Sequence, residues 1–267
     1  AANWYLEDGS VTVNADNSGQ TVTQGGGSAV PDEAPVITQR ESSVETGNTI
    51  AINASDNAAA NVTIKDINIK SSNDAIDVKG SSSANITLEG DNKIFSETGS
   101  ALHVSDGNVT INGSGSLKAE IQDDLGSDYN HNAKIGSHEN EDMSGSIHIT
   151  GDATVKTDDN IAPNCGGDGA GIGTGENGEM SGNIVIDGNA QVEVSSNDRG
   201  AGIGTGDDGN LSGNIMIGGN AQVSATGAEG SAGIGTGDDG NFTGSITMDG
   251  NARVTAYCQS RRRSQWF

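Results

Sequence analysis

A 31-residue unit that recurs almost unchanged along the second half of the chain constrains the fold most strongly. The segment from Gly169 to Arg199 reads "GAGIGTGENGEMSGNIVIDGNAQVEVSSNDR", and its "AGIGTG" motif begins at Ala170, Ala201 and Ala232. Repeats of this length are typical of solenoids, in which each unit buries its apolar side chains only against its neighbours. The sequence therefore predicts a stack of similar units rather than a layered globular core.

A short alternating segment extends the repeat toward the N-terminus. It reads as Asn or Ser, then two residues, then Ile, Leu or Met, and it begins at residues 61, 85, 108, 146, 183, 214 and 245. Most units carry two further short β-type segments, such as "AGIG" at Ala170 and "VEV" at Val192. Three short strands per unit, joined by loops of variable length, indicate an all-β fold: a right-handed parallel β-helix of roughly seven to nine coils.

Equivalent side chains of successive coils are expected to stack, because neighbouring strands lie about 4.8 Å apart. Residues two apart in a strand share a face, so the apolar positions of each short strand point inward together. The predicted interior stacks are Ile147, Ile184, Ile215 and Ile246; Val155, Val192, Val223 and Val254; and Met143, Met180, Leu211 and Phe242. Asn189, Asn220 and Asn251, with Asp152 at the equivalent corner, are expected to form a ladder of stacked turn amides.

The chain divides into three parts by the regularity of this pattern. Residues 1–55 alternate less regularly and are expected to form irregular first coils that cap the stack. Residues 56–256 carry the regular coils, with near-identical 31-residue repeats from about residue 170. Residues 257–267, "YCQSRRRSQWF", leave the pattern, and we interpret them as a disordered or artefactual tail.

The composition limits the classes of partner. An apolar content of 32% and a net charge of -24 are typical of disordered chains, but Val and Ile at fixed offsets favour a folded stack. Thirteen Lys and Arg against 37 Asp and Glu argue against nucleic acid, since phosphate contacts need clustered basic residues. The sequence has no apolar run of about 18 residues, so membrane insertion is not expected.

The cysteines and histidines carry little signal. Cys165 and Cys258 are roughly three coils apart, or about 14 Å along the axis. A disulfide needs Cα atoms within about 7 Å, so the two are not expected to pair. His131 and His138 flank "NAKIGS", but the histidines lack metal-ligand spacing, and chance polar placement is preferred over a weak transition-metal site.

The acidic turn of each coil is the strongest candidate for chemistry. Glu139, Glu176, Asp207 and Asp238 share one repeat position, and Asn140, Asn177, Asp208 and Asp239 follow them. Stacked carboxylates about 5 Å apart repel by roughly 1 to 3 kcal/mol, depending on the dielectric. Two interpretations follow: a solvated acidic turn, or a Ca²⁺ ladder with Glu139, Glu176, Asp207, Asp208, Asp238 and Asp239 as ligands.

Several segments resemble a known family. "DGSVTV", "ANITLEGDNKI", "GSALHVSDGNVTINGSGSLKA" and the repeated "GAGIGTG...SGNIVIDGNAQV", between about residues 9 and 256, look like the carbohydrate-binding-domain family of secreted and cell-surface parallel β-helix proteins of Gram-positive, often gut, bacteria. The resemblance implies secretion and a fold similar to pectate lyases. It also implies binding of acidic polysaccharide and calcium without catalysis. It implies no particular binding residue.

A non-catalytic binding or adhesion module is therefore the expected function, as part of a larger, monomeric surface protein. An acidic polysaccharide would be repelled by this chain unless Ca²⁺ bridged it, so the polysaccharide and calcium hypotheses are coupled. The alternative partner is a host or other surface protein bound through Tyr129 and Asp128 in the loop 121–132. A polysaccharide lyase or hydrolase is disfavoured, because the paired acids lie in repeated turns, whereas catalytic residues are usually singular.

Overall fold

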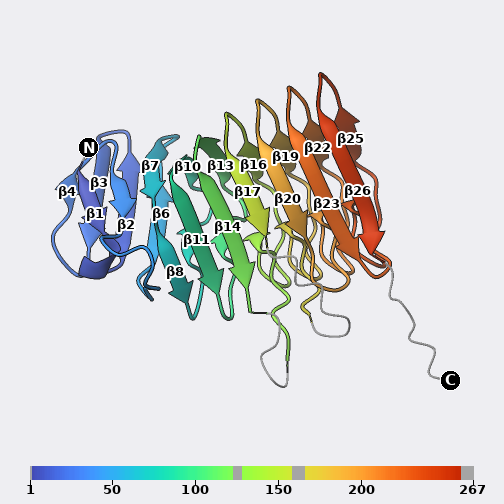
Figure 1. The fold of residues 1–267 in the computed structure, drawn as a ribbon, viewed down its shortest axis with the longest axis horizontal. Coiled ribbons are helices and arrows are strands. Elements are labelled where there is room, and N and C mark those ends of the chain that lie inside the picture. The colour runs from blue at the N-terminus through green and yellow to red at the C-terminus, as the bar shows by residue number, and fades with distance from the viewer. Residues whose placement is uncertain (1, 123–127, 158–165, 260–267) are drawn as a thin grey trace.

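The computed structural model describes residues 2–122, 128–157 and 166–259, and within them the chain is almost entirely β-structure. A single turn of 3-10 helix, η1 (Leu6–Asp8), is the exception among these residues. Short strands follow one another into three sheets, and the sheets run side by side along one long axis (Figure 1). The predicted all-β, parallel-strand repeat architecture is thus confirmed.

Sheet A contains, in spatial order, β1 (Asn3–Tyr5), β5 (Val36–Thr38), β7 (Ala59–Lys65), β10 (Ser83–Glu89), β13 (Asn108–Gly113), β16 (Ser146–Ile149), β19 (Asn183–Ile186), β22 (Asn214–Ile217) and β25 (Ser245–Met248). Sheet B contains β4 (Val30–Pro31), β3 (Gly19–Gln24), β2 (Val11–Asp16), β6 (Ile50–Ala54), β9 (Ile76–Val78), β12 (Leu102–His103), β15 (Ile135–Gly136), β18 (Ile172–Gly173), β21 (Ile203–Gly204) and β24 (Ile234–Gly235). Sheet C contains β8 (Asn68–Ser71), β11 (Asp91–Ser96), β14 (Ser116–Ile121), β17 (Thr154–Thr157), β20 (Gln191–Ser195), β23 (Gln222–Ala228) and β26 (Arg253–Gln259).

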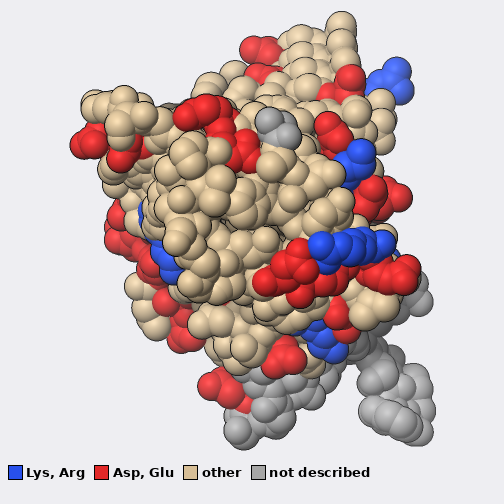
Figure 2. Space-filling view, turned by 90° about the vertical axis from the view of Figure 1, so that its left-hand side faces the viewer, with Lys and Arg blue, Asp and Glu red and all other residues tan. Residues whose placement is uncertain are grey.

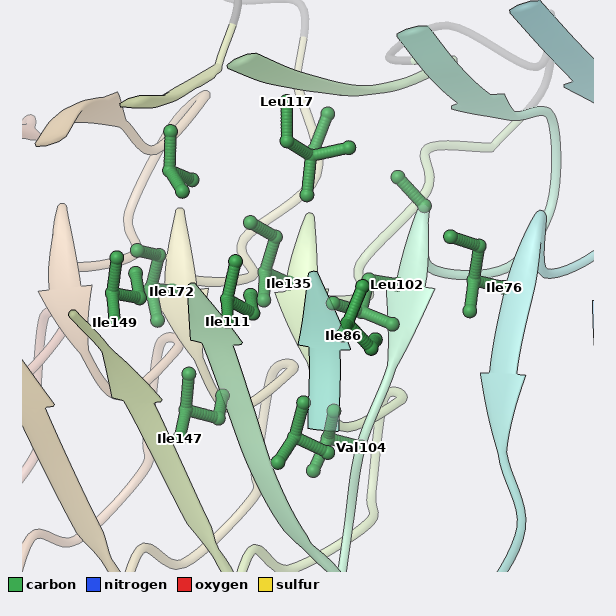
Figure 3. Close-up of a cluster of buried hydrophobic side chains, with 14 of the residues drawn as sticks. Ile76, Ile86, Leu102, Val104, Ile111, Leu117, Ile135, Ile147, Ile149 and Ile172 are labelled. Carbon is green, nitrogen blue, oxygen red and sulfur yellow. The ribbon is translucent and has the colours of Figure 1, made fainter. Parts of the chain in front are cut away.

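The strand register confirms the three predicted interior stacks. Ile184 pairs with Ile147 and Ile215, and Val192 pairs with Val155 and Val223. Isolated parallel bridges join Met143 to Met180, Met180 to Leu211, and Leu211 to Phe242. Most of these side chains are fully buried, but Ile246 and Phe242 are 37% and 47% exposed, because no further coil within the described residues covers them. Apolar side chains of the earlier coils form one continuous column (Figure 3). Burial of Ile and Val at about 25 cal/mol per Å² is therefore the main stabilising contribution.

The turn amides form the predicted ladder. Asn189 Nδ2 donates to Asp152 Oδ1 at 2.8 Å, and Asn220 Nδ2 donates to Asn189 Oδ1 at 3.1 Å. Asn251 Nδ2 continues the series to Asn220 Oδ1 at 3.2 Å. These exposed amides satisfy one another across coils, so their repetition has a structural cause.

The N-terminal residues differ from the regular coils. Strand β2 pairs parallel with β6, but β3 pairs antiparallel with β2, and β4 antiparallel with β3. Residues 1–55 thus place a small antiparallel meander at one end of sheet B. Figure 2 looks onto this end and shows red carboxylates scattered round a largely uncharged face.

The C-terminal part departs from the predicted boundary. Strand β26 continues to Gln259 and pairs with β23 through Tyr257, Cys258 and Gln259. The first three residues of the expected tail therefore belong to sheet C, because the backbone of β23 offers hydrogen-bond partners up to Ala228. Residues 260–267 lie outside the described residues.

Candidate functional site

The acidic turns lie between the sheet B strand and the sheet A strand of each coil. Their second position has positive φ in all four coils: 58° at Asn140, 58° at Asn177, 55° at Asp208 and 55° at Asp239. Asn and Asp adopt this left-handed conformation more readily than other residues with side chains. Backbone geometry therefore accounts for Asp208 and Asp239, both of which are exposed.

Backbone hydrogen bonds join the acidic turns of successive coils, so the residues at the first position of each turn lie above one another, as predicted. The Asn140 amide donates to the Glu176 carbonyl at 2.8 Å, and the Asn177 amide donates to the Asp207 carbonyl at the same distance. The environments of the side chains differ from coil to coil. Glu139 is exposed, Glu176 and Asp238 are half-buried, and Asp207 is only 5% exposed.

A second column of residues, not predicted from the sequence, packs against these acids. It consists of His131, Asp168 and Arg199, each two residues before the alanine that opens the sheet B motif. Their carbonyl oxygens accept hydrogen bonds at 2.9 Å from the amides of Glu176, Asp207 and Asp238, respectively. Their constant spacing from the alanine could have revealed this column in the sequence. The three residues are of different types, however, so they do not look like a repeat.

The two columns form ion pairs. His131 Nδ1 lies 2.7 Å from Glu176 Oε2 and 3.3 Å from Asp168 Oδ2. One coil further along, Arg199 Nη1 lies 3.5 Å from Asp207 Oδ2. Part of the repulsion expected within the acidic ladder is thus relieved by basic side chains of this protein.

Burial and neighbouring charges shift the pKa values of these side chains. The hydrogen bond with Asp168 and the charge of Glu176 raise the pKa of His131 to about 9. Burial and the neighbouring Asp168 carboxylate raise the pKa of Asp207 to about 6, in spite of Arg199. Burial also raises the pKa of Glu176. A further cation would be favoured at this edge.

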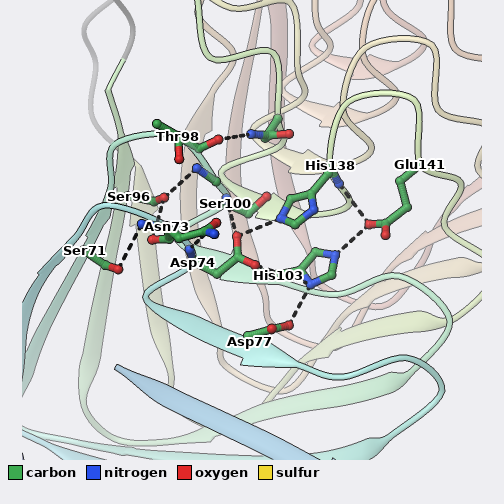
Figure 4. Close-up of polar contacts among 12 residues, drawn as sticks. Ser71, Asn73, Asp74, Asp77, Ser96, Thr98, Ser100, His103, His138 and Glu141 are labelled. Atoms are coloured by element: carbon green, nitrogen blue, oxygen red, sulfur yellow. Dashed lines mark hydrogen bonds and ion pairs between the residues drawn. The ribbon is translucent and has the colours of Figure 1, made fainter. Parts of the chain in front are cut away.

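A second polar cluster surrounds His103 (Figure 4). His103 Nδ1 lies 2.8 Å from Asp77 Oδ1, and its Nε2 lies 2.6 Å from Glu141 Oε1. His138 stacks on His103 with ring centroids 3.9 Å apart, and His138 Nε2 lies 2.7 Å from Asp74 Oδ1. His131 and His138, which flank one short motif, thus belong to different clusters.

The His103 cluster is arranged as an ion network rather than as a metal site. Asp74, His103 and His138 bring ligand atoms within 4.8 Å of one another. The two imidazole planes are within 9° of parallel, however, and a metal ion lies in the plane of each ring that binds it. Burial acts against a charge on His103, but hydrogen bonds to Asp77 and Glu141 raise its pKa to about 10.

The outer face of sheet C carries a column of lysines. Register pairs Lys93 of β11 with Lys118 of β14, and Lys118 with Lys156 of β17. All three are exposed. The face lies across the front of Figure 1, where β11, β14 and β17 are adjacent. In a chain of net charge -24, this is a local concentration of positive charge.

The lysines line a shallow groove. One hollow of about 440 Å³ is bordered by Lys93, Lys118 and Lys156, together with Asp91 and Ser116. A second, of about 360 Å³, shares Lys156 and continues over the outward side chains Gln191, Glu193, Gln222, Ser224, Arg253 and Thr255. The groove therefore crosses the strands and follows the long axis of the solenoid.

Tyr129 and Asp128, the expected protein-contact residues, are at the surface. Tyr129 is 38% exposed, and its ring meets that of His131 edge-on, with centroids 6.4 Å apart. Asp128 Oδ1 accepts a hydrogen bond from the Tyr129 amide at 2.9 Å. Residues 123–127 of the same loop lie outside the described residues. Cys258 is exposed in β26, and Cys165 also lies outside the described part of the chain.

Comparison of the chain with protein-family models, with curated proteins and with solved structures gave no match. The resemblance to the carbohydrate-binding-domain family therefore stays a prediction. Within the described ranges, no helix has the length and apolar character needed to cross a bilayer.

Proposed function

We propose that this protein is a non-catalytic, secreted or surface-attached binding module that holds an extended acidic polysaccharide along sheet C. The scaffold would be a right-handed parallel β-helix of roughly seven to nine coils. The register of Lys93, Lys118 and Lys156 is the observation that carries the proposal. A polymer with one carboxylate per sugar matches a surface that repeats its charge from strand to strand.

The spacing of the lysines favours an extended anionic chain over a single small anion. Adjacent strands lie about 4.8 Å apart, so the three ammonium groups cover about 10 Å along the axis. The groove continues beyond them over amide and hydroxyl side chains, which can donate hydrogen bonds to sugar hydroxyls. Phe95, two residues from Lys93 on the same strand, adds an apolar surface, with Lys70 Nζ 5.5 Å from its ring centroid.

The net negative charge of the protein does not prevent such binding. Charges separated by more than about 8 Å are largely screened at physiological salt, so the local lysines dominate contacts within the groove. Acidic partners reduce this effect: Lys118 contacts Glu120, and Lys156 Nζ lies 3.2 Å from Glu193. Weak binding that depends strongly on salt is therefore expected.

A larger hollow elsewhere on the molecule is less suited to an acidic ligand. It measures about 550 Å³ and lies beside strands β2 and β3. Asp16 and Glu33 both line it, and Lys79, which also borders it, is held by Asp77 at 2.5 Å. An anionic chain would meet carboxylates there.

Removing the lysine column should weaken binding to polygalacturonate. A variant with Lys93→Gln, Lys118→Gln and Lys156→Gln loses three attractions worth about 0.2–1 kcal/mol each, so we expect roughly a tenfold loss of affinity. Isothermal titration calorimetry at two salt concentrations measures this loss and the salt dependence.

The matched control carries Arg40→Gln, Lys65→Gln and Lys79→Gln, which remove the same number of charges away from sheet C. Equal weakening by both variants would mean that only net charge matters, and the groove would be excluded. Calcium bridging is the alternative, and it predicts that EDTA abolishes binding, whereas direct binding by lysines persists in EDTA. Release of unsaturated or newly reducing sugar ends would contradict a non-catalytic module.

A further inference from the structure

The side chains of His131, Asp168 and Glu176 converge at the edge of the solenoid that carries the acidic turns. From this geometry we propose that they form a binding site for a divalent transition-metal ion of the zinc class. The proposal is independent of the lysine groove, because these residues come from the turns around sheet B and not from the sheet C face. The proposed site lies between two neighbouring coils, of which the first contains His131 and the second contains Asp168 and Glu176.

The ligand atoms are already close to the spacing that such an ion needs. His131 Nδ1 is 2.7 Å from Glu176 Oε2 and 3.3 Å from Asp168 Oδ2, and one atom from each residue lies within 4.8 Å of the others. Zinc binds nitrogen and carboxylate oxygen at about 2.0–2.2 Å, which places tetrahedral ligand atoms about 3.4 Å apart. Small side-chain rotations would therefore be sufficient.

The site is also partly withdrawn from solvent and held by the fold. The side chains of His131, Asp168 and Glu176 are 17%, 16% and 21% exposed. The backbone bond from the Glu176 amide to the His131 carbonyl fixes two of the residues relative to each other. The Asp168 backbone N–H donates to His131 Nδ1 at 3.2 Å, and a bound ion would take the place of this hydrogen bond. Asp128 Oδ1 lies 3.7 Å from His131 Nε2, which is a charge contact and too long for a hydrogen bond.

Two coils further along, the same position of the column is filled by a permanent cation. Arg199 is the residue of this column that faces Asp207, and a guanidinium keeps its charge at any physiological pH. His131 faces Glu176 instead, and an imidazole can release its proton and offer a lone pair to a metal ion. The repeat thus contains a fixed charge in one coil and an exchangeable ligand in another.

The donor set selects the class of ion. Ca²⁺ takes six to eight oxygen ligands, whereas one imidazole nitrogen with two carboxylates is a set that Zn²⁺ and similar ions bind. Two carboxylates also balance the charge of a divalent ion once the His131 proton has left. At this step of the stack, the proposal is therefore a single site with a nitrogen ligand instead of the expected calcium ladder.

Titration of the full chain with Zn²⁺, followed by calorimetry, tests the proposal. Cys165→Ser and Cys258→Ser are introduced first, so that thiolates do not bind the ion. We expect one equivalent to bind, and Co²⁺ bound in its place should give the visible absorption of a low-symmetry site. Glu176→Gln should weaken Zn²⁺ binding by at least about 100-fold, since the loss of even an orienting partner costs 10–100-fold.

His131→Arg is the most informative variant, because a guanidinium keeps a positive charge beside Glu176 and Asp168 but offers no lone pair, so this variant should fold without binding the ion. His148→Gln is the matched control: its Nε2 pairs with Asp187 Oδ1 at 2.9 Å in a half-buried pair outside the site, and Zn²⁺ binding should be unchanged. The proposal fails if the parent chain binds no Zn²⁺, if folded His131→Arg binds it as the parent does, or if equimolar Ca²⁺ displaces it.

Discussion

Replacing Gly173 by alanine is expected to destabilise the stack by about 3–7 kcal/mol. Gly173 has φ of +139°, which side chains rarely allow, and an added Cβ would lie 1.7 Å from the Gly204 carbonyl oxygen of the next coil. That oxygen accepts the Thr174 amide at 3.1 Å, so moving it costs a hydrogen bond as well. The range combines about 1–3 kcal/mol of backbone strain, about 1–3 of overpacking and about 1 for the bond.

Gly235 provides an internal control for this prediction. It has nearly the same φ, +144°, at the equivalent place of the last described coil, but its Cβ would approach only the Ala232 side chain, at 3.0 Å. Gly235→Ala should therefore show the backbone strain without most of the clash, at about 1–3 kcal/mol. Thermal unfolding and hydrogen exchange of β18 and β24 measure both. Equal effects would mean that contact between coils does not set the cost at Gly173.

Replacing His103 by glutamine is expected to destabilise the protein by about 3–5 kcal/mol near neutral pH, because it leaves partly buried carboxylates without their cation. His103 is 8% exposed, between Asp77 and Glu141. Although burial opposes the charge of Asp77, hydrogen bonds from His103 and Lys79 lower its pKa. Burial likewise opposes ionisation of Glu141, and the bond from His103 lowers its pKa.

The His103 cluster also predicts how the free energy of unfolding depends on pH. The pKa of His103 is about 10 in the folded protein and 6.5 in an unfolded chain, so its stabilisation is complete below pH 6.5 and is lost as pH rises toward 10. Asp77 and Glu141 have lowered pKa values, so their stabilisation is lost on acidification below their unfolded values. Lys79, Asp74 and His138 contact the same network.

Melting temperatures between pH 5 and pH 10 test this profile. The parent protein should lose stability above about pH 7, and the glutamine variant should lose much less over the same interval. His148→Gln, in a half-buried pair, should change the free energy of unfolding by less than about 1 kcal/mol. Parallel curves for parent and variant would show that His103 is not the group responsible.

The apolar stacks were predictable from sequence because each repeats at a constant place in its coil. Strand pairing aligns Ile184 and Val192 with the equivalent residues of the preceding coil. The spacing between these two positions is the same in each coil, even where the loops differ in length. The turn amides were predictable for the same reason. Backbone geometry, which the repeat spacing alone does not reveal, explains why Asn or Asp occupies the turn position of Asp208 and Asp239.

The polar sites were harder to predict because they combine different coils. Lys93 and Lys118 are 25 residues apart, and Lys118 and Lys156 are 38 apart, so no local window contains them. The lysine column could have been found by aligning the sheet C strands of successive coils and comparing the outward-facing residue in the middle of each strand. The clusters of His131 and His103 depend on how loops of unequal length fold against the turns, which periodicity does not specify.

The side-chain hydrogen bonds between neighbouring coils have a consequence for loop length. Hydrogen-bonded partners are 37 residues apart between Asp152 and Asn189 and 31 apart between Asn189 and Asn220. The entropy of closing a loop grows only with the logarithm of its length, so the longer coil costs about 0.2 kcal/mol more than the shorter one. Insertions between strands are therefore almost neutral for the scaffold, and each coil is free to vary its loops while its strands stay in register.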